Sequence, residues 1–219
     1  MKQKLYKRLN RHLNEVAMLT PEQYDSLTEL VNIGFSRAAN SLSELTGDRI
    51  ILNVPKVKLT TVSQMEEHLS PKYPGEVSTV HQIFKGEISG DAVLVLDSKS
   101  GLKLCDLVAQ YEIGHYTEYT TEAIEVLTET GNIIMNSCLG IFGNMLNVHF
   151  TFSIPHMSVT SLKAMIQSLI SGKNKNDYAL LITMSFIMRD SHITGYIIML
   201  MSISSFELLI SSLSKLEEN

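Results

Sequence analysis

Two glutamate–asparagine pairs are the residues of this chain whose types and spacing could perform chemistry. Glu29 stands three positions before Asn32, and Glu129 stands three positions before Asn132. Residues three apart on a helix are neighbours on one face, so each pair would project together from a rigid element. An asparagine amide is a poor nucleophile and no general base, but it offers a donor and an acceptor that can hold a water molecule. This ability matters most in phosphoryl hydrolysis, where catalysis is largely positioning and charge stabilisation.

Repetition distinguishes these pairs from ordinary surface residues. A single exposed Glu–Asn pair would be interpreted as a solvated helix surface, but asparagine is a weak helix former that no mid-helix position requires. The second pair lies 100 residues after the first, and the prolines that follow the pairs, Pro55 and Pro155, keep the same offset. This spacing predicts a duplicated unit with one site in each half.

Each pair lies within a long predicted helix, over residues 20–45 in the first copy and about 120–146 in the second. Each helix begins at a threonine that can cap it, and each carries an apolar stripe at helical spacing, which predicts one buried face. The predicted stripes extend to Leu45 and Met145. Polar residues that fall near the pairs, away from the stripes, are expected to support the sites or bind substrate: Asp25, Ser36, Glu125 and Asn136.

The segments after each long helix predict three strands per half. We therefore expect an α/β (α+β) fold with pseudo-two-fold symmetry: a six-stranded, mostly antiparallel sheet with the two long helices on one face. Pro55 and Pro155 cannot donate to a strand ladder, so their strands should bulge or lie at an edge there. The predicted strands are residues 49–62, 76–84, 88–96, 147–160, 178–188 and 192–202.

Length and composition are consistent with one packed domain of two repeats. The chain has 219 residues, of which 44% are hydrophobic and 19% charged. We expect a domain over residues 20–219, with repeats at about 20–111 and 120–219, preceded by a basic, helical extension over residues 1–19. The net charge of −5 gives no general attraction to nucleic acid or to anionic lipid.

The sequence contains no recognisable targeting or membrane-spanning segment, so we expect a cytoplasmic protein. Its two cysteines, Cys105 and Cys138, are unclustered, and the histidines lack zinc spacing. This pattern favours a reducing compartment and argues against a disulfide framework or a metal site.

The spacing of the first copy resembles the signature of the CheC/CheX/FliY phosphatases of bacterial and archaeal chemotaxis. That signature is an acidic residue or serine, three residues, Glu, two residues, Asn, 22 residues and then Pro, which Asp25, Glu29, Asn32 and Pro55 match completely. The second copy matches except at Glu125, where the family usually has Asp or Ser. Two copies in a sequence without an added flagellar-switch domain resemble the CheC arrangement.

The resemblance implies a phosphatase that removes phosphate from the aspartyl phosphate of a CheY-like response regulator. Asn32 and Asn132 would each align a water in line with the phosphorus, and Glu29 and Glu129 would hold a lysine of the regulator. Mg²⁺ would belong to the regulator, and this chain would need no metal or cofactor of its own. The resemblance also implies a second partner, a CheD-like deamidase. The alternative is a non-catalytic adaptor that binds a response regulator or that deamidase through the same helix faces.

Overall fold

A computed structural model describes residues 19–171 and 177–217. The predicted basic helix over residues 1–19 lies, apart from its last residue, outside the described residues. The helices are α2 (Pro21–Thr46), α3 (Val62–Leu69), η1 (Ser70–Lys72), α4 (Ser98–Val108), α5 (Thr121–Leu146), α6 (Leu162–Ile170) and α7 (Ile203–Glu217). The strands are β1 (Ile50–Thr61), β2 (Glu76–Gly86), β3 (Gly90–Asp97), β4 (Phe150–Phe152), β5 (His156–Ser161), β6 (Tyr178–Met188) and β7 (Ser191–Met201).

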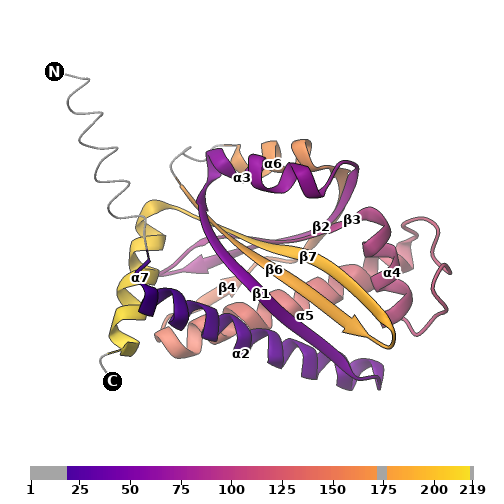
Figure 1. Ribbon diagram of the computed structural model, residues 1–219, viewed down its shortest axis with the longest axis horizontal. Coiled ribbons are helices and arrows are strands. Elements are labelled where there is room, and N and C mark those ends of the chain that lie inside the picture. The colour runs from indigo at the N-terminus through magenta and orange to yellow at the C-terminus, as the bar shows by residue number, and fades with distance from the viewer. Residues whose placement is uncertain (1–18, 172–176, 218–219) are drawn as a thin grey trace.

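The fold is a curved antiparallel sheet between two layers of helices, with α2 and α5 on one face and α3 and α6 on the other (Figure 1). This confirms the predicted fold class, with both long helices on one face. The sheet has seven strands in the order β1-β6-β7-β3-β2-β4, and β5 also pairs with β2. The number differs from the six expected because the predicted strand over 147–160 is divided around Ser153–Pro155 into β4 and β5.

The two halves of the chain exchange strands to build this sheet. β1 of the first half pairs with β6 of the second, and β5 of the second half pairs with β2 of the first. β3 and β7 pair at the centre. The register of β1 shifts between Asn53 and Lys56, and β1 ends the strand order, so the prediction of an irregular edge strand at Pro55 is confirmed.

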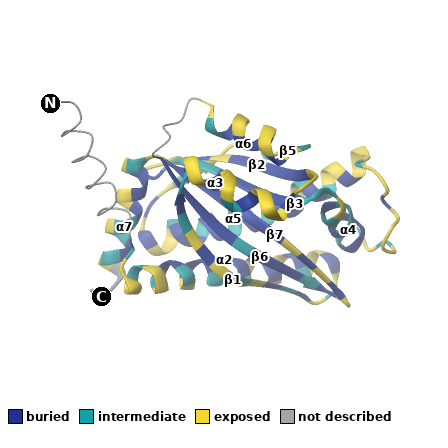
Figure 2. Ribbon diagram, turned by 45° about the horizontal axis from the view of Figure 1, so that its top comes forward, coloured by how far each residue is buried: buried dark blue, intermediate teal, exposed yellow. Residues whose placement is uncertain are grey.

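Strand alternation divides the apolar residues between two cores. On β6, Leu180 and Ile182 face the core beneath α2 and α5, whereas Ala179 and Leu181 face the core beneath α3 and α6. The central strands β6 and β7 are therefore buried on both faces, while the outward sides of α3 and α6 are exposed (Figure 2). The central strands thus form a rigid platform for the helices on both faces.

The long helices repeat each other closely. Each has 26 residues, follows a capping threonine and ends at a left-handed residue, with φ of 69° at Gly47 and 54° at Asn147. They cross where Gly34 meets α5, since a Cβ atom built on Gly34 would lie 2.7 Å from the Cα atom of Cys138. Only a residue without a side chain fits this crossing. The contact fixes how the two faces that carry the Glu–Asn pairs are placed relative to one another.

The predicted stripes were wrong at their last positions. Leu45 is 61% exposed and Met145 is 46% exposed. In α2 the buried face advances four residues from Leu42, to Thr46, rather than three. In α5 it advances four residues from Phe142, to Leu146, rather than four from Ile141. Helical spacing permits either step, and the direction in which the chain leaves for the following strand decides between them.

Candidate functional site

The first pair projects from the middle of α2. Thr20 caps this helix by accepting a hydrogen bond from the Gln23 amide (3.2 Å), and the Gln23 side chain accepts one from the Thr20 amide (3.0 Å). Because the helix buries its apolar stripe against the sheet and α5, the opposite side reaches solvent. Glu29 is exposed and Asn32 is half-buried. The prediction that this pair lies on the helix side opposite the apolar stripe is confirmed.

The carboxamide of Asn32 is available for a ligand. Its side chain forms no hydrogen bond with the described part of the chain, although its backbone carbonyl accepts one from the Ser36 hydroxyl (2.9 Å). Ser36 therefore points its proton at the helix backbone rather than at the amide. Asp25 is exposed one turn before Glu29. The structure thus brings the four predicted residues of the first copy to one exposed helix surface.

The second pair, on α5, has a different environment. The Nδ2 atom of Asn132 donates to Oε2 of Glu129 (3.3 Å), and its Oδ1 atom accepts from Nδ2 of Asn136 (2.7 Å). Oδ1 also accepts a longer contact from Nε2 of Gln82 (3.4 Å), which reaches it from β2. Of the predicted residues of this copy, Glu129, Asn132 and Asn136 are linked directly. Glu125 is exposed one turn earlier.

The partners of these amides fix their orientation. The carbonyl oxygen of Ser153 can only accept, so the Gln82 atom 3.0 Å from it must be the amide nitrogen. An ionised Glu129 can likewise only accept, so Nδ2 of Asn132 faces that carboxylate and Oδ1 faces inward. Both acceptor sites of Oδ1 are then occupied by protein donors. A water that needed this oxygen would have to displace Asn136 or Gln82.

Sequence reasoning missed Gln82 and Ser153, which hold the second amide in place. Gln82 is 2% exposed, and its Oε1 atom accepts no hydrogen bond from the described residues. Its counterpart at the first site follows from the strand register. Thr61 pairs with Tyr178, and Ser161, its equivalent 100 residues on, pairs with Glu76. Six residues further along each strand, Gln82 of β2 therefore matches Met184 of β6.

The two sites are consequently unequal. Met184 is fully buried and offers no donor to Asn32, whereas Gln82 offers one to Asn132. Gln82 stands among other polar residues of β2, such as Thr79 and His81, so nothing in the local pattern distinguished it. The sequence could not show which helix that strand would face.

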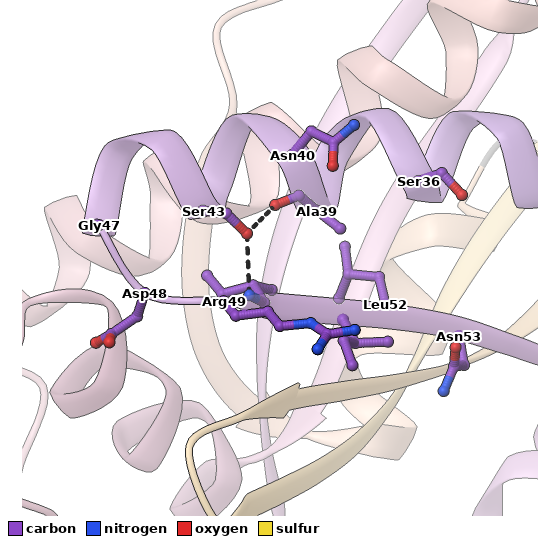
Figure 3. A pocket seen from close by; sticks show the side chains of 11 residues that line it. Ser36, Ala39, Asn40, Ser43, Gly47, Asp48, Arg49, Leu52 and Asn53 are labelled. Atoms are coloured by element: carbon purple, nitrogen blue, oxygen red, sulfur yellow. Dashed lines mark hydrogen bonds between the residues drawn. The ribbon is translucent and has the colours of Figure 1, made fainter.

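A groove of about 580 Å³ adjoins the first site (Figure 3). It begins at Ser36, one turn after Asn32, and continues between the C-terminal half of α2 and the start of β1. Ser43 links the two sides of the groove, because its hydroxyl donates to the Ala39 carbonyl of α2 (2.7 Å) and accepts from the Ile50 amide of β1 (2.9 Å). The groove therefore extends the concave surface beside Asn32 toward the start of β1.

The rest of the described chain offers no competing chemistry of the kinds considered from the sequence. In residues 19–171 and 177–217, no three His, Cys, Asp or Glu side chains converge as a metal site would require. Burial raises the pKa of the Cys138 thiol to about 12, so this cysteine stays protonated near neutral pH and is a poor nucleophile. His149 and His156 are exposed. None of the helices in the same ranges combines the length and apolar character needed to cross a membrane.

Comparisons with known proteins agree with this geometry. A model of the CheC-like family matches residues 22–59, which include all four signature positions of the first copy. FliY of Thermotoga maritima has a similar structure, with a TM-score of 0.75 and 21% sequence identity over 90% of this chain and 98% of that chain. FliM of H. pylori, from its complex with FliG, has a TM-score of 0.67 and 12% identity over 88% of this chain and 100% of that chain.

A second structure of FliM from H. pylori, its middle domain, has a TM-score of 0.61 and 13% identity over 89% of this chain and 99% of that chain. At sequence identities this low, the structural similarity establishes the common fold alone. Within that fold, this chain carries the signature residues Glu29 and Asn32 on the solvent-facing side of α2. The match to the CheC-like family model is thus confined to the segment that carries the signature, and the structural similarities show that the chain shares the fold of FliY and FliM.

Proposed function

We propose that this protein hydrolyses the aspartyl phosphate of a CheY-like response regulator. The observation that carries the proposal is the placement of both Glu–Asn pairs on the solvent-facing sides of twin helices, with each asparagine half-buried and each glutamate exposed. A half-buried amide on a rigid helix can enter a partner's active site without a large entropic cost, because the helix already fixes its position.

The amide would act by positioning rather than by bond-making. The Oδ1 atom of Asn32 would accept a hydrogen bond from a water molecule, so that a lone pair of that water points at the phosphorus. The water oxygen forms the new bond to phosphorus as the bond to the aspartyl oxygen breaks, and the regulator recovers its free carboxylate. Glu29 would hold a lysine of the regulator, and Mg²⁺ bound by the regulator would neutralise charge on the phosphoryl oxygens. The chain itself would supply no metal or cofactor.

The two sites should contribute unequally. The amide of Asn32 is free to present its oxygen, whereas the oxygen of Asn132 already accepts from Asn136 and Gln82. We expect the Asn32 site to be the faster one. The Asn132 site would need to exchange a protein hydrogen bond for one to water before each turnover.

An adaptor role is the second candidate, and two observations favour it. The amide of Asn132 is engaged within the protein, and the same fold occurs in FliM, which has been crystallised in complexes with FliG and with SpeE. In this role the helix faces would bind a response regulator or a CheD-like deamidase without hydrolysis. The two roles differ in whether bound regulator loses its phosphate faster than free regulator.

The test is the release of phosphate from phosphorylated response regulators of the same organism. Wild-type protein should accelerate release, the Asn32→Ala/Asn132→Ala variant should not, and Asn32→Ala should lose more activity than Asn132→Ala. Ser41→Ala/Asn144→Ala is a matched control, because it removes one exposed polar side chain from each of the same helices, outside both the signature and the groove. Binding of the phosphorylated regulator without acceleration by the wild type would establish the adaptor role instead.

A further inference from the structure

A second concave site lies on the opposite face of the sheet, beneath α3. It encloses about 200 Å³ between the edge strand β1, the end of α3 and the inner strands β6 and β7. Its floor is apolar where Leu69 and Leu181 are buried, and its remaining lining is basic or hydroxylated. The polar lining residues are Lys56, Lys58, His68, Lys72, Thr183 and Tyr196.

The basic groups converge from separate elements. Nζ of Lys58 on β1 lies 3.3 Å from Nδ1 of His68 on α3. Lys72 of η1 donates to the hydroxyl of Tyr196, and its ammonium lies 4.7 Å from the centre of that ring. Within the described residues, no carboxylate lies within 4.0 Å of the ammonium groups of Lys56, Lys58 or Lys72. In a protein of net charge −5, three unpaired cations around one pocket form a local site of opposite sign.

These contacts leave donors directed at a ligand. Nδ1 of His68 accepts from the Lys58 ammonium, which places the imidazole proton on Nε2 in the neutral ring. The hydroxyl oxygen of Tyr196 accepts from Lys72, so its own proton remains available to donate. Ammonium, imidazole N–H and hydroxyl groups are the donors that bind phosphate oxygens, and lysine serves there as a compact point charge.

Edge protection explains only part of this cluster. Lysines on an edge strand discourage pairing with another sheet, and Lys56 and Lys58 lie on β1, at the edge of this one. They share one face because they are two residues apart, opposite Thr183 and Leu181. Edge protection does not require a histidine and a third lysine to approach the same pocket from α3 and η1.

The second half of the chain provides an internal control. It carries an equivalent pocket of about 270 Å³ beneath α6, in which Ser158, Ser168 and Leu169 stand 100 residues after Lys58, His68 and Leu69. The strand positions also correspond, since His81 pairs with Val93 as Thr183 pairs with Tyr196. The fold therefore forms this pocket twice but lines it with three lysines only once among the described residues. The charge is a property of the first pocket and not a requirement of the architecture.

We propose that the pocket beneath α3 binds the phosphate group of a small phosphorylated ligand. A volume of about 200 Å³ suits a phosphate ion or a short phosphomonoester, because sites for larger ligands typically enclose roughly 300–1,000 Å³. Lys58 and Lys72 supply the charge, and Tyr196 and Thr183 supply hydroxyl donors. The pocket faces away from the Glu–Asn helices, so this assignment does not depend on the proposed phosphatase activity.

Nuclear magnetic resonance titration of the full chain tests the proposal. Inorganic phosphate, and in a separate arm glycerol 3-phosphate, is added at constant ionic strength while the amides of Leu69, Thr183 and Tyr196 are monitored. Saturable shifts at these residues are expected, and the arm with the lower dissociation constant distinguishes free phosphate from a phosphomonoester. Chloride at the same ionic strength should produce no saturable shift.

Variants separate a built site from diffuse attraction. The Lys58→Gln/Lys72→Gln protein should bind at least about tenfold more weakly, since two charge-assisted contacts are lost. Tyr196→Phe keeps the charge and removes one hydroxyl, so it should weaken binding by a smaller factor. The control, Lys99→Gln/Lys163→Gln, removes the same charge from exposed lysines on α4 and α6 and should bind as the wild type does. Absence of saturable shifts in the wild type, or equal weakening in the control, would overturn the proposal.

Discussion

Replacing Asn132 by alanine should destabilise the protein, whereas the same replacement at Asn32 should not. The sequence alone gave no reason to treat the two differently, because both are polar residues on exposed helix faces. The structure separates them. Asn132 joins Glu129, Asn136 and Gln82 in one hydrogen-bonded cluster, and the amide of Asn32 has no partner among the described residues.

The expected cost follows from the three contacts. The 2.7 Å bond from Asn136 is the strong one, and a net side-chain hydrogen bond contributes about 1 kcal/mol. The contact to Glu129 is exposed and the one from Gln82 is long (3.4 Å), so each adds less, although the buried Gln82 amide loses an acceptor. Alanine regains about 0.5 kcal/mol of helix propensity. The sum predicts a loss of about 1–2 kcal/mol for Asn132→Ala and a change within about 0.5 kcal/mol for Asn32→Ala.

Urea denaturation of the two variants measures this difference. The midpoint should fall for Asn132→Ala with an unchanged slope, and the melting temperature should fall by about 2–4 °C for each kcal/mol in a chain of this size. Equal stabilities of the two variants would refute the assignment of the cluster. The comparison applies only if both variants unfold in a single transition.

A double-mutant cycle identifies the partner from β2. Gln82→Met introduces the residue type found at the equivalent position, Met184. It removes the contact to Asn132, and it also removes the buried Oε1 atom, which accepts no hydrogen bond from the described residues. We expect a coupling of roughly 0.5–1 kcal/mol between the substitutions at positions 82 and 132. Strictly additive effects would mean that Gln82 does not hold the amide.

Other predictions concern the core. Gly34→Ala should destabilise the protein by roughly 1–3 kcal/mol, because the new Cβ atom would lie 2.7 Å from the backbone of Cys138. Gly140→Ala should stabilise it by roughly 0.5–1 kcal/mol, because no atom lies within 4 Å of that Cβ position. Thermal unfolding compares the two variants, and a stabilised Gly34 variant would disprove the helix crossing. Burial raises the pKa of the Cys105 and Cys138 thiols from 9.0 to about 12. Between these values the unfolded chain releases protons that the native protein retains, so the free energy of unfolding should fall as pH rises, by roughly 1.4 kcal/mol per pH unit and thiol. Urea denaturation from pH 8 to 11, with and without both cysteines replaced by alanine, isolates this contribution, and identical slopes would contradict it.

The duplicated frame could be predicted from the sequence because its signals are local. Capping threonines, apolar stripes and the Glu–Asn pairs all lie within single elements, and the prolines follow in the next segment of the chain. They predicted both long helices and the exposure of Glu29 and Glu129. The error at Leu45 and Met145 arose where local periodicity no longer determines burial, in the final turn of each helix.

The strand order and the contacts around the second site could not be predicted, because they depend on long-range strand pairing. That β1 pairs with β6, and β5 with β2, depends on contacts between residues about 75 to 140 positions apart in the sequence, which no local pattern encodes. The same pairing brings Gln82 to Asn132 across 50 residues of sequence. It also brings Tyr196 to Lys72, so the basic pocket was invisible as a motif. The asymmetry between two nearly identical signatures is therefore a tertiary property.

The central claim is that the asparagine amides act on bound regulator rather than merely contacting it. The most direct measurement is the single-turnover decay of a regulator's aspartyl phosphate at saturating concentrations of this protein, with affinity determined in parallel. We predict that the Asn32→Ala/Asn132→Ala variant binds the phosphorylated regulator with nearly wild-type affinity but leaves its decay at the spontaneous rate. Decay that remains as fast in the saturated variant as with the wild-type protein would contradict the account.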